Sequence, residues 1–112
     1  MRMRKRHNLE PRMEKCAGYI IKDSTAHCGR WMQDFPGYEK LYVELGCGKG
    51  RFTADTAASM PDTLFLAIEK VPDAMIIAME RIRDRELENV RFIDGDAAAL
   101  TEMFAPGEAD RI

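Results

Sequence analysis

The chain lacks any long apolar run. Its longest uninterrupted stretch of apolar residues, 74–79, has six members, whereas a membrane-spanning helix needs roughly 20. The basic N-terminal cluster is followed by the polar segment 7–12 and not by the apolar core of a signal peptide. We therefore expect neither a membrane segment nor secretion.

Cysteine is scarce and scattered. Cys16, Cys28 and Cys47 are odd in number and form no CxxC pair, so they predict neither a disulfide framework nor a zinc site. The pattern favours a reducing cytoplasm, and no metal is expected. With 112 residues, 46% of them hydrophobic, the chain fits one folded domain and is not disordered throughout.

Apolar and amphipathic segments alternate from residue 39 onward. Strands are predicted at 41–45, 64–68 and 90–93, with the start of a fourth at 110–112, and helices at 51–60, 72–87 and 97–104. This β-α-β-α-β-α-β order indicates an α/β fold with a parallel sheet and helices on both faces. In such sheets ligands bind beyond the carboxyl ends of the strands.

Residues 1–38 show no sustained period and are expected to form a basic N-terminal arm and lead-in to a domain spanning 39–112. Trp31 and Phe35, four positions apart, are expected to pack one helical turn of this segment onto the body. The cations at the start of the arm could attract a polyanion, or they could belong to a solvated, frayed terminus. These cations are Arg2, Arg4, Lys5 and Arg6.

A glycine-rich segment, Gly46-Cys47-Gly48-Lys49-Gly50, stands between the first predicted strand and the next helix. Its alternate glycines allow positive φ angles and a close backbone approach to a ligand, so Gly46, Gly48 and Gly50 are candidate cofactor contacts. The segment is no Walker A loop, because no hydroxyl residue follows Lys49 to hold Mg²⁺. It also departs from the GxGxxG dinucleotide fingerprint, because Arg51 stands where the third, close-packing glycine would be.

Acidic residues follow the second and third predicted strands. Glu69 lies 19 residues beyond Gly50, the spacing at which a carboxylate accepts hydrogen bonds from ribose hydroxyls. At the end of the third strand, a carboxylate of Asp94 or Asp96 and an adjacent N–H, such as that of Ala97, could recognise the edge of adenine. The same aspartates could instead cap the following helix, and both roles can hold together.

Glu44 is a charged residue inside an apolar strand, two positions before the first glycine. Burying its carboxylate without a partner would be costly, and a cationic ligand group would remove that cost. S-adenosylmethionine carries an ammonium and a sulfonium, whereas NAD carries a pyrophosphate that Glu44 would repel. Glu44 therefore favours S-adenosylmethionine over a dinucleotide.

Together these motifs resemble those of the bacterial tRNA (guanine-N7-)-methyltransferases, over essentially the whole chain. The segments that carry the resemblance are Met1–Lys5, Trp31, Val43–Phe52, Ala67–Glu69, Asn89–Arg91, Gly95–Ala97 and Phe104–Ile112. The resemblance implies a Rossmann-like class I methyltransferase sheet, truncated to three parallel strands and the start of a fourth. It also implies S-adenosylmethionine as cofactor, tRNA as partner, and methyl transfer to N7 of a guanine in the tRNA variable loop.

The resemblance also implies roles for individual residues. Glu44, Glu69 and Asp96 would contact the cofactor, and the backbone of 46–50 would lie beside its methionine and ribose portions. The basic residues of 2–6 would contact tRNA phosphates. In this family the catalytic aspartate follows the fourth strand, so the catalytic residues are expected beyond Ile112 and the 112-residue chain alone is expected to be inactive and poorly stable.

Two other hypotheses belong to different functional classes. A nicotinamide-dinucleotide-binding Rossmann fragment would use the same glycine loop and Glu69, although Glu44 and the missing third glycine count against it. A non-catalytic RNA-binding module would use only the basic arm.

Overall fold

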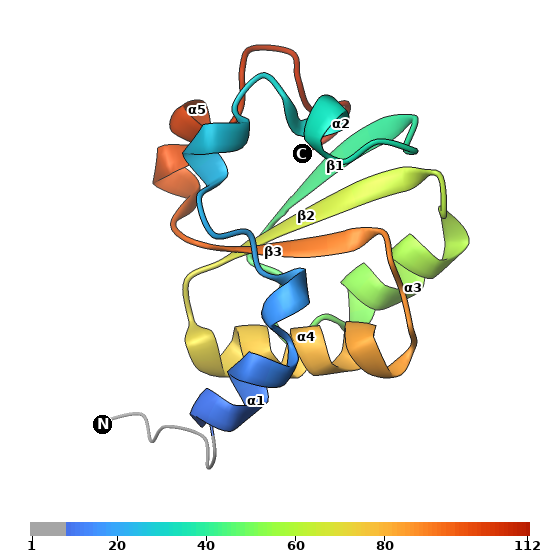
Figure 1. Ribbon diagram of the computed structural model, residues 1–112, viewed down its shortest axis with the longest axis vertical. Coiled ribbons are helices and arrows are strands. Elements are labelled where there is room, and N and C mark those ends of the chain that lie inside the picture. The colour runs from blue at the N-terminus through green and yellow to red at the C-terminus, as the bar shows by residue number, and fades with distance from the viewer. Residues whose placement is uncertain (1–8) are drawn as a thin grey trace.

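The computed structural model describes residues 9–112, which form a parallel sheet with helices on both faces (Figure 1). The strand order is β1-β2-β3, with β1 at Lys40–Leu45, β2 at Thr63–Glu69 and β3 at Val90–Asp94. The α-helices are α1 (Leu9–Lys15), α2 (Trp31–Asp34), α3 (Arg51–Ser59), α4 (Pro72–Asp84) and α5 (Leu100–Met103), and the 3-10 helices are η1 (Ala17–Tyr19), η2 (Ser24–His27) and η3 (Ala97–Ala99). Within residues 9–112, each helix is too short or too polar to span a bilayer.

The alternation of side chains along each strand divides the core into two parts. Phe65 and Ala67 of β2 pack with buried residues of α3 and α4, whereas Leu64, Leu66 and Ile68 pack with Trp31 and the α5 region. Every residue of β2 is buried, as expected for a central strand covered on both faces. The fold therefore matches the predicted α/β architecture.

The three predicted strands are confirmed to within one residue at each end, but two predicted helices are shorter. The helix expected at 97–104 is a 3-10 turn, η3, followed by the single turn α5. The helix expected at 72–87 ends at Asp84, because Glu86 adopts a left-handed φ of 54°. The N–H of Leu87 donates to the carbonyl of Ile82 (3.1 Å) and that of Glu86 to Arg83 (2.9 Å), which is the Schellman pattern with a glutamate in the usual glycine position.

The edge of β1 that faces away from β2 is partly paired within residues 9–112. Arg111 forms a parallel bridge with Tyr42, and the Val43 N–H donates to the Arg111 carbonyl at 2.8 Å. This pairing confirms the predicted opening of a fourth strand. Beside it, Leu45 and Ile112 are 45% and 63% exposed, so apolar surface remains open along this edge.

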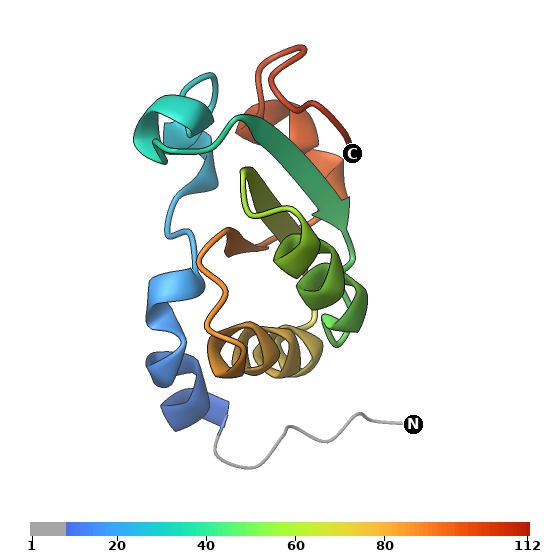
Figure 2. The same ribbon diagram turned by 90° about the vertical axis from the view of Figure 1, so that its right-hand side faces the viewer.

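Residues 9–38 pass from one face of the sheet to the other (Figures 1 and 2). α1 packs on α4, where the guanidinium of Arg12 pairs with the Glu80 carboxylate at 2.5 Å. The chain then forms a parallel bridge from Ile20 to Phe92, beside β3, and continues to the other face.

On that second face, Trp31 is fully buried, as predicted for a packing anchor. Its ring stacks on Phe35 and on Phe104, and its indole N–H donates to the Met103 carbonyl at 2.8 Å. The Glu108 carboxylate accepts hydrogen bonds from the backbone N–H groups of Gly29 (2.8 Å), Trp31 (3.0 Å) and Ala105 (2.9 Å). These contacts join the segment before β1 to the segment after α5.

Candidate functional site

The carboxyl ends of the three strands surround a cavity of about 270 Å³. It is lined by Leu45, Gly46, Ile68, Glu69, Lys70, Gly95, Asp96 and Ala97. The parallel register explains this grouping, because Leu45 lies opposite Ile68 and Glu69 lies opposite Asp94. Four of the predicted cofactor-binding residues, Gly46, Glu69, Asp96 and Ala97, are thus brought together at one edge of the sheet.

Glu69 is the buried acid of this cavity, with only 8% of its surface exposed. One carboxylate oxygen accepts a hydrogen bond from the Gly48 N–H at 3.0 Å, and the other accepts from the N–H groups of Lys70 and Val71, both at 3.1 Å. These bonds satisfy a charge that would otherwise be costly to bury. They also attach the glycine loop to the end of β2, which places Gly48 next to the cavity although it does not line it.

The three loop glycines all adopt left-handed backbone angles, with φ of 73° at Gly46, 54° at Gly48 and 78° at Gly50. Gly50 is also the N-cap residue of α3 and lies directly against α4. A Cβ at position 50 would stand 2.6 Å from the Cβ and 2.8 Å from the Cα of Ala78. In the dinucleotide pattern, the close-packing glycine would stand at position 51. Here Gly50, one residue earlier, has that role.

Asp96 takes the capping role that the sequence left open. Its carboxylate accepts a hydrogen bond from the Ala98 N–H at 3.0 Å and caps η3. Asp94, Asp96 and Ala97 are exposed, and of these three Asp96 and Ala97 line the cavity. Asp96 is therefore accessible to a ligand that enters this cavity from solvent.

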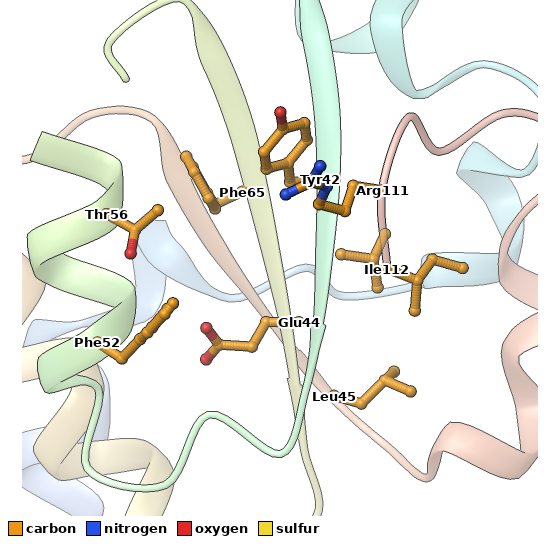
Figure 3. A pocket seen from close by; sticks show the side chains of 9 residues that line it. Tyr42, Glu44, Leu45, Phe52, Thr56, Phe65, Arg111 and Ile112 are labelled. Atoms are coloured by element: carbon orange, nitrogen blue, oxygen red, sulfur yellow. The ribbon is translucent and has the colours of Figure 1, made fainter. Parts of the chain in front are cut away.

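Glu44 does not share this cavity. Its side chain extends from β1 toward α3, in a second cavity of about 480 Å³, where Figure 3 shows it near Phe52 and Thr56. Leu45 lines both cavities and lies at the boundary between them. The site therefore has two compartments, one with Glu69 and Asp96 and one with Glu44.

The Glu44 carboxylate is half-buried and accepts a hydrogen bond from the hydroxyl of Thr53, in the first turn of α3. The cost of burying Glu44, which we expected a cationic ligand group to remove, is thus partly offset by Thr53, because its hydroxyl supplies one donor. Sequence reasoning missed Thr53. Its signal was a hydroxyl residue at the third position of a helix that begins directly after the loop.

The Cys47 thiol of the glycine loop is affected both by burial and by two nearby carboxylates. Burial and the nearby carboxylates of Glu69 and Glu44 raise the pKa of the Cys47 thiol from its ordinary 9.0 to about 12. Cys47 is therefore a neutral thiol near pH 7. The same carboxylates that disfavour a thiolate would also disfavour a pyrophosphate and favour a cation.

Two other predictions concern nucleic acid and metal. Arg2, Arg4, Lys5 and Arg6 lie outside the described residues, so their predicted contact with tRNA stays a prediction. Across residues 9–112, no cluster of three or more His, Cys, Asp or Glu side chains could hold a metal ion.

Comparisons with known proteins relate the chain to methyltransferases. A family model described as "Putative methyltransferase" matches residues 38–112. The tRNA (guanine-N(7)-)-methyltransferases of Geobacillus thermodenitrificans, Bacillus cytotoxicus and Clostridium tetani are 35%, 31% and 30% identical over all 112 residues. The match covers 52%, 52% and 53% of these proteins, so the chain spans about half the length of the curated relatives it matches.

A solved structure supports the fold alone. It is described as "Structure of an antibiotic related Methyltransferase" and superposes with a TM-score of 0.59 at 21% identity. The superposition covers 73% of this chain and 42% of that one.

Proposed function

Because the chain belongs to the methyltransferase family whose model matches residues 38–112, we propose that it binds S-adenosylmethionine for methyl transfer to N7 of a guanine in tRNA. The observation that carries the proposal is the cavity at the strand ends, where a buried acid, a glycine loop and a capping aspartate meet. The names of the relatives support tRNA guanine as the substrate. We further propose that this guanine lies in the tRNA variable loop and that the protein works in the cytoplasm.

Each compartment suits one portion of the cofactor. In the first, Glu69 would accept hydrogen bonds from the ribose hydroxyls, and Asp96 with the N–H of Ala97 would recognise adenine. The backbone of 46–50 would lie beside the ribose and methionine portions. In the second, Glu44 would attract the ammonium group. S-adenosylmethionine supplies a methyl group activated by its sulfonium.

The reaction requires little acid–base catalysis from the protein. Guanine N7 already carries an in-plane lone pair, so no side chain has to remove a proton before the attack. The main task is to align the nitrogen with the methyl carbon and the sulfur, which can contribute roughly 7–11 kcal/mol in well-oriented systems. Arg2, Arg4, Lys5 and Arg6 would hold tRNA phosphates.

The dinucleotide alternative is less compatible with the site. Glu69 could bind a nicotinamide ribose, but the carboxylates of Glu44 and Glu69, on either side of the glycine loop in sequence, would repel a pyrophosphate.

Calorimetric titration of the chain with S-adenosylmethionine and with NADH separates these two functions. We expect S-adenosylmethionine to bind and Glu69→Ala to weaken that binding by about 1.5–3 kcal/mol, the usual contribution of hydrogen bonds to a charged group. Glu102→Ala, which removes an exposed acid on α5, is the control and should leave the affinity unchanged. Saturable NADH binding without a response to S-adenosylmethionine would refute the proposal.

Activity can be tested in a chimera. Residues 1–112 would be joined to the part of the Geobacillus thermodenitrificans relative that lies beyond the matched region. We expect this chimera to transfer labelled methyl groups to tRNA. Deletion of residues 1–6 should lower tRNA affinity and reduce the salt dependence by about four phosphate contacts. An unchanged salt slope would show that the arm does not bind tRNA.

A further inference from the structure

Thr53 connects the two ends of the glycine loop. Glu44 is the penultimate residue of β1, and Thr53 is the third residue of α3, so the loop lies between them in sequence. The Thr53 side chain is fully buried, and its hydroxyl donates a hydrogen bond to the Glu44 carboxylate.

This hydrogen bond is directed away from the helix. Threonine hydroxyls inside helices commonly bond to the backbone carbonyl one turn earlier. Thr53 instead donates to a carboxylate of the neighbouring strand. The bond occupies one oxygen of Glu44, while the other oxygen has no hydrogen bond from the described residues and remains available in the cavity shown in Figure 3.

We propose that Thr53 is a positioning residue that holds the Glu44 carboxylate in the orientation that binds the ammonium group of the cofactor. This inference rests on the proposed function, because it assigns the ammonium to Glu44. The orientation depends on α3, whose N-cap Gly50 packs against Ala78 of α4. Because α3 is held in place by this packing, the Thr53 hydroxyl has a fixed position and can orient the Glu44 carboxylate.

Thr53→Val is the decisive substitution, because valine preserves the shape and removes the donor. The probes are S-adenosylhomocysteine, which carries the amino-acid portion, and 5′-methylthioadenosine, which lacks it. We expect Thr53→Val to weaken S-adenosylhomocysteine binding about five- to tenfold, as for the loss of one hydrogen bond, and to leave 5′-methylthioadenosine binding unchanged. Thr53→Ser keeps the hydroxyl and should restore most of the affinity.

Three outcomes overturn the inference. An equal loss for both ligands would show that Thr53 only supports the fold. An unchanged affinity would show that Glu44 needs no support. A gain for S-adenosylhomocysteine would show that Thr53 neutralises Glu44 and does not orient it. Urea unfolding of each variant, measured without ligand, separates lost affinity from lost folding.

The failure of the inference is distinguishable from failure of the proposed function. If Glu44→Gln weakens S-adenosylhomocysteine binding selectively while Thr53→Val does not, the proposed site stands and the positioning role falls. If Glu44→Gln changes neither affinity, Glu44 is not the ammonium partner and the inference falls with that assignment. If the unsubstituted chain binds neither ligand, the proposed function is itself refuted.

Discussion

Replacing Gly50 by alanine should destabilise the chain through two separable effects. The first is backbone strain, because Gly50 has a φ of 78° and alanine tolerates this left-handed conformation poorly. The second is a steric clash, because the new Cβ would stand 2.6 Å from the Cβ of Ala78 and 2.8 Å from its Cα. Gly50 is buried where α3 meets α4, so neither helix can give way without disturbing the core.

Gly107 is a matched control for the strain. It has nearly the same φ, 75°, but an added Cβ would meet no atom within 4 Å. Alanine at Gly107 should therefore cost about 1–2 kcal/mol, the usual penalty for a left-handed non-glycine residue. At Gly50 the clash should add about 1–3 kcal/mol, as in other overpacked cores. We expect a difference of that size between the two variants.

Urea unfolding at low protein concentration, monitored by circular dichroism, measures the free energies of unfolding of the Gly50→Ala and Gly107→Ala variants. Adding Ala78→Gly to the Gly50→Ala variant should recover only part of the loss, because it removes the Cβ of residue 78 but leaves its backbone equally close to the new side chain. Equal destabilisation by Gly50→Ala and Gly107→Ala would refute the close-packing role of Gly50.

Three further predictions concern the hydrogen bonds of Glu108, the thiol of Cys47 and the open strand edge. Glu108→Gln should lower the free energy of unfolding by about 1–3 kcal/mol in a urea titration, because the Glu108 carboxylate accepts hydrogen bonds from three backbone N–H groups. The control substitution Glu102→Gln, at an exposed position, should change this free energy little. The raised pKa of Cys47 means that the folded state retains a proton that the unfolded state loses, so its contribution to stability is complete below pH 9 and is lost as pH rises toward about 12. Cys47→Ala should therefore flatten the alkaline decline of the urea midpoint, and an identical decline in both proteins would contradict this. We expect the chain to self-associate through the partly paired edge of β1, beside which Leu45 is 45% exposed. Leu45→Lys should therefore reduce concentration-dependent self-association in analytical ultracentrifugation, and unchanged self-association would exclude this edge as its cause.

The strands could be predicted from sequence because their signals are local. Central strands of a parallel sheet are buried on both faces, so the run 64–68 is continuously apolar and its ends are abrupt. The early end of α4 could not be predicted, because it depends on Glu86 in a left-handed conformation that glycine usually adopts. Glutamate carries no sequence signal for that conformation.

The candidate site was predictable in part for the same reason. Glu69, Asp96 and the loop glycines each follow a strand, and parallel pairing brings strand ends to one edge without further information. The three backbone donors to Glu69 and the hydroxyl donor to Glu44 were not predictable, because they depend on how the loop folds back on the strands.

By itself, the sequence determined the order of strands and helices, the edge at which the acids gather and the absence of a long apolar run. These properties depend on residue type and on spacing along the chain. Only the tertiary structure decided that Gly50 is the close-packing glycine, that Glu44 and Glu69 line separate cavities, and that the Thr53 hydroxyl donates a hydrogen bond to Glu44. Those outcomes depend on distances between residues that approach one another only after the helices have packed on the sheet.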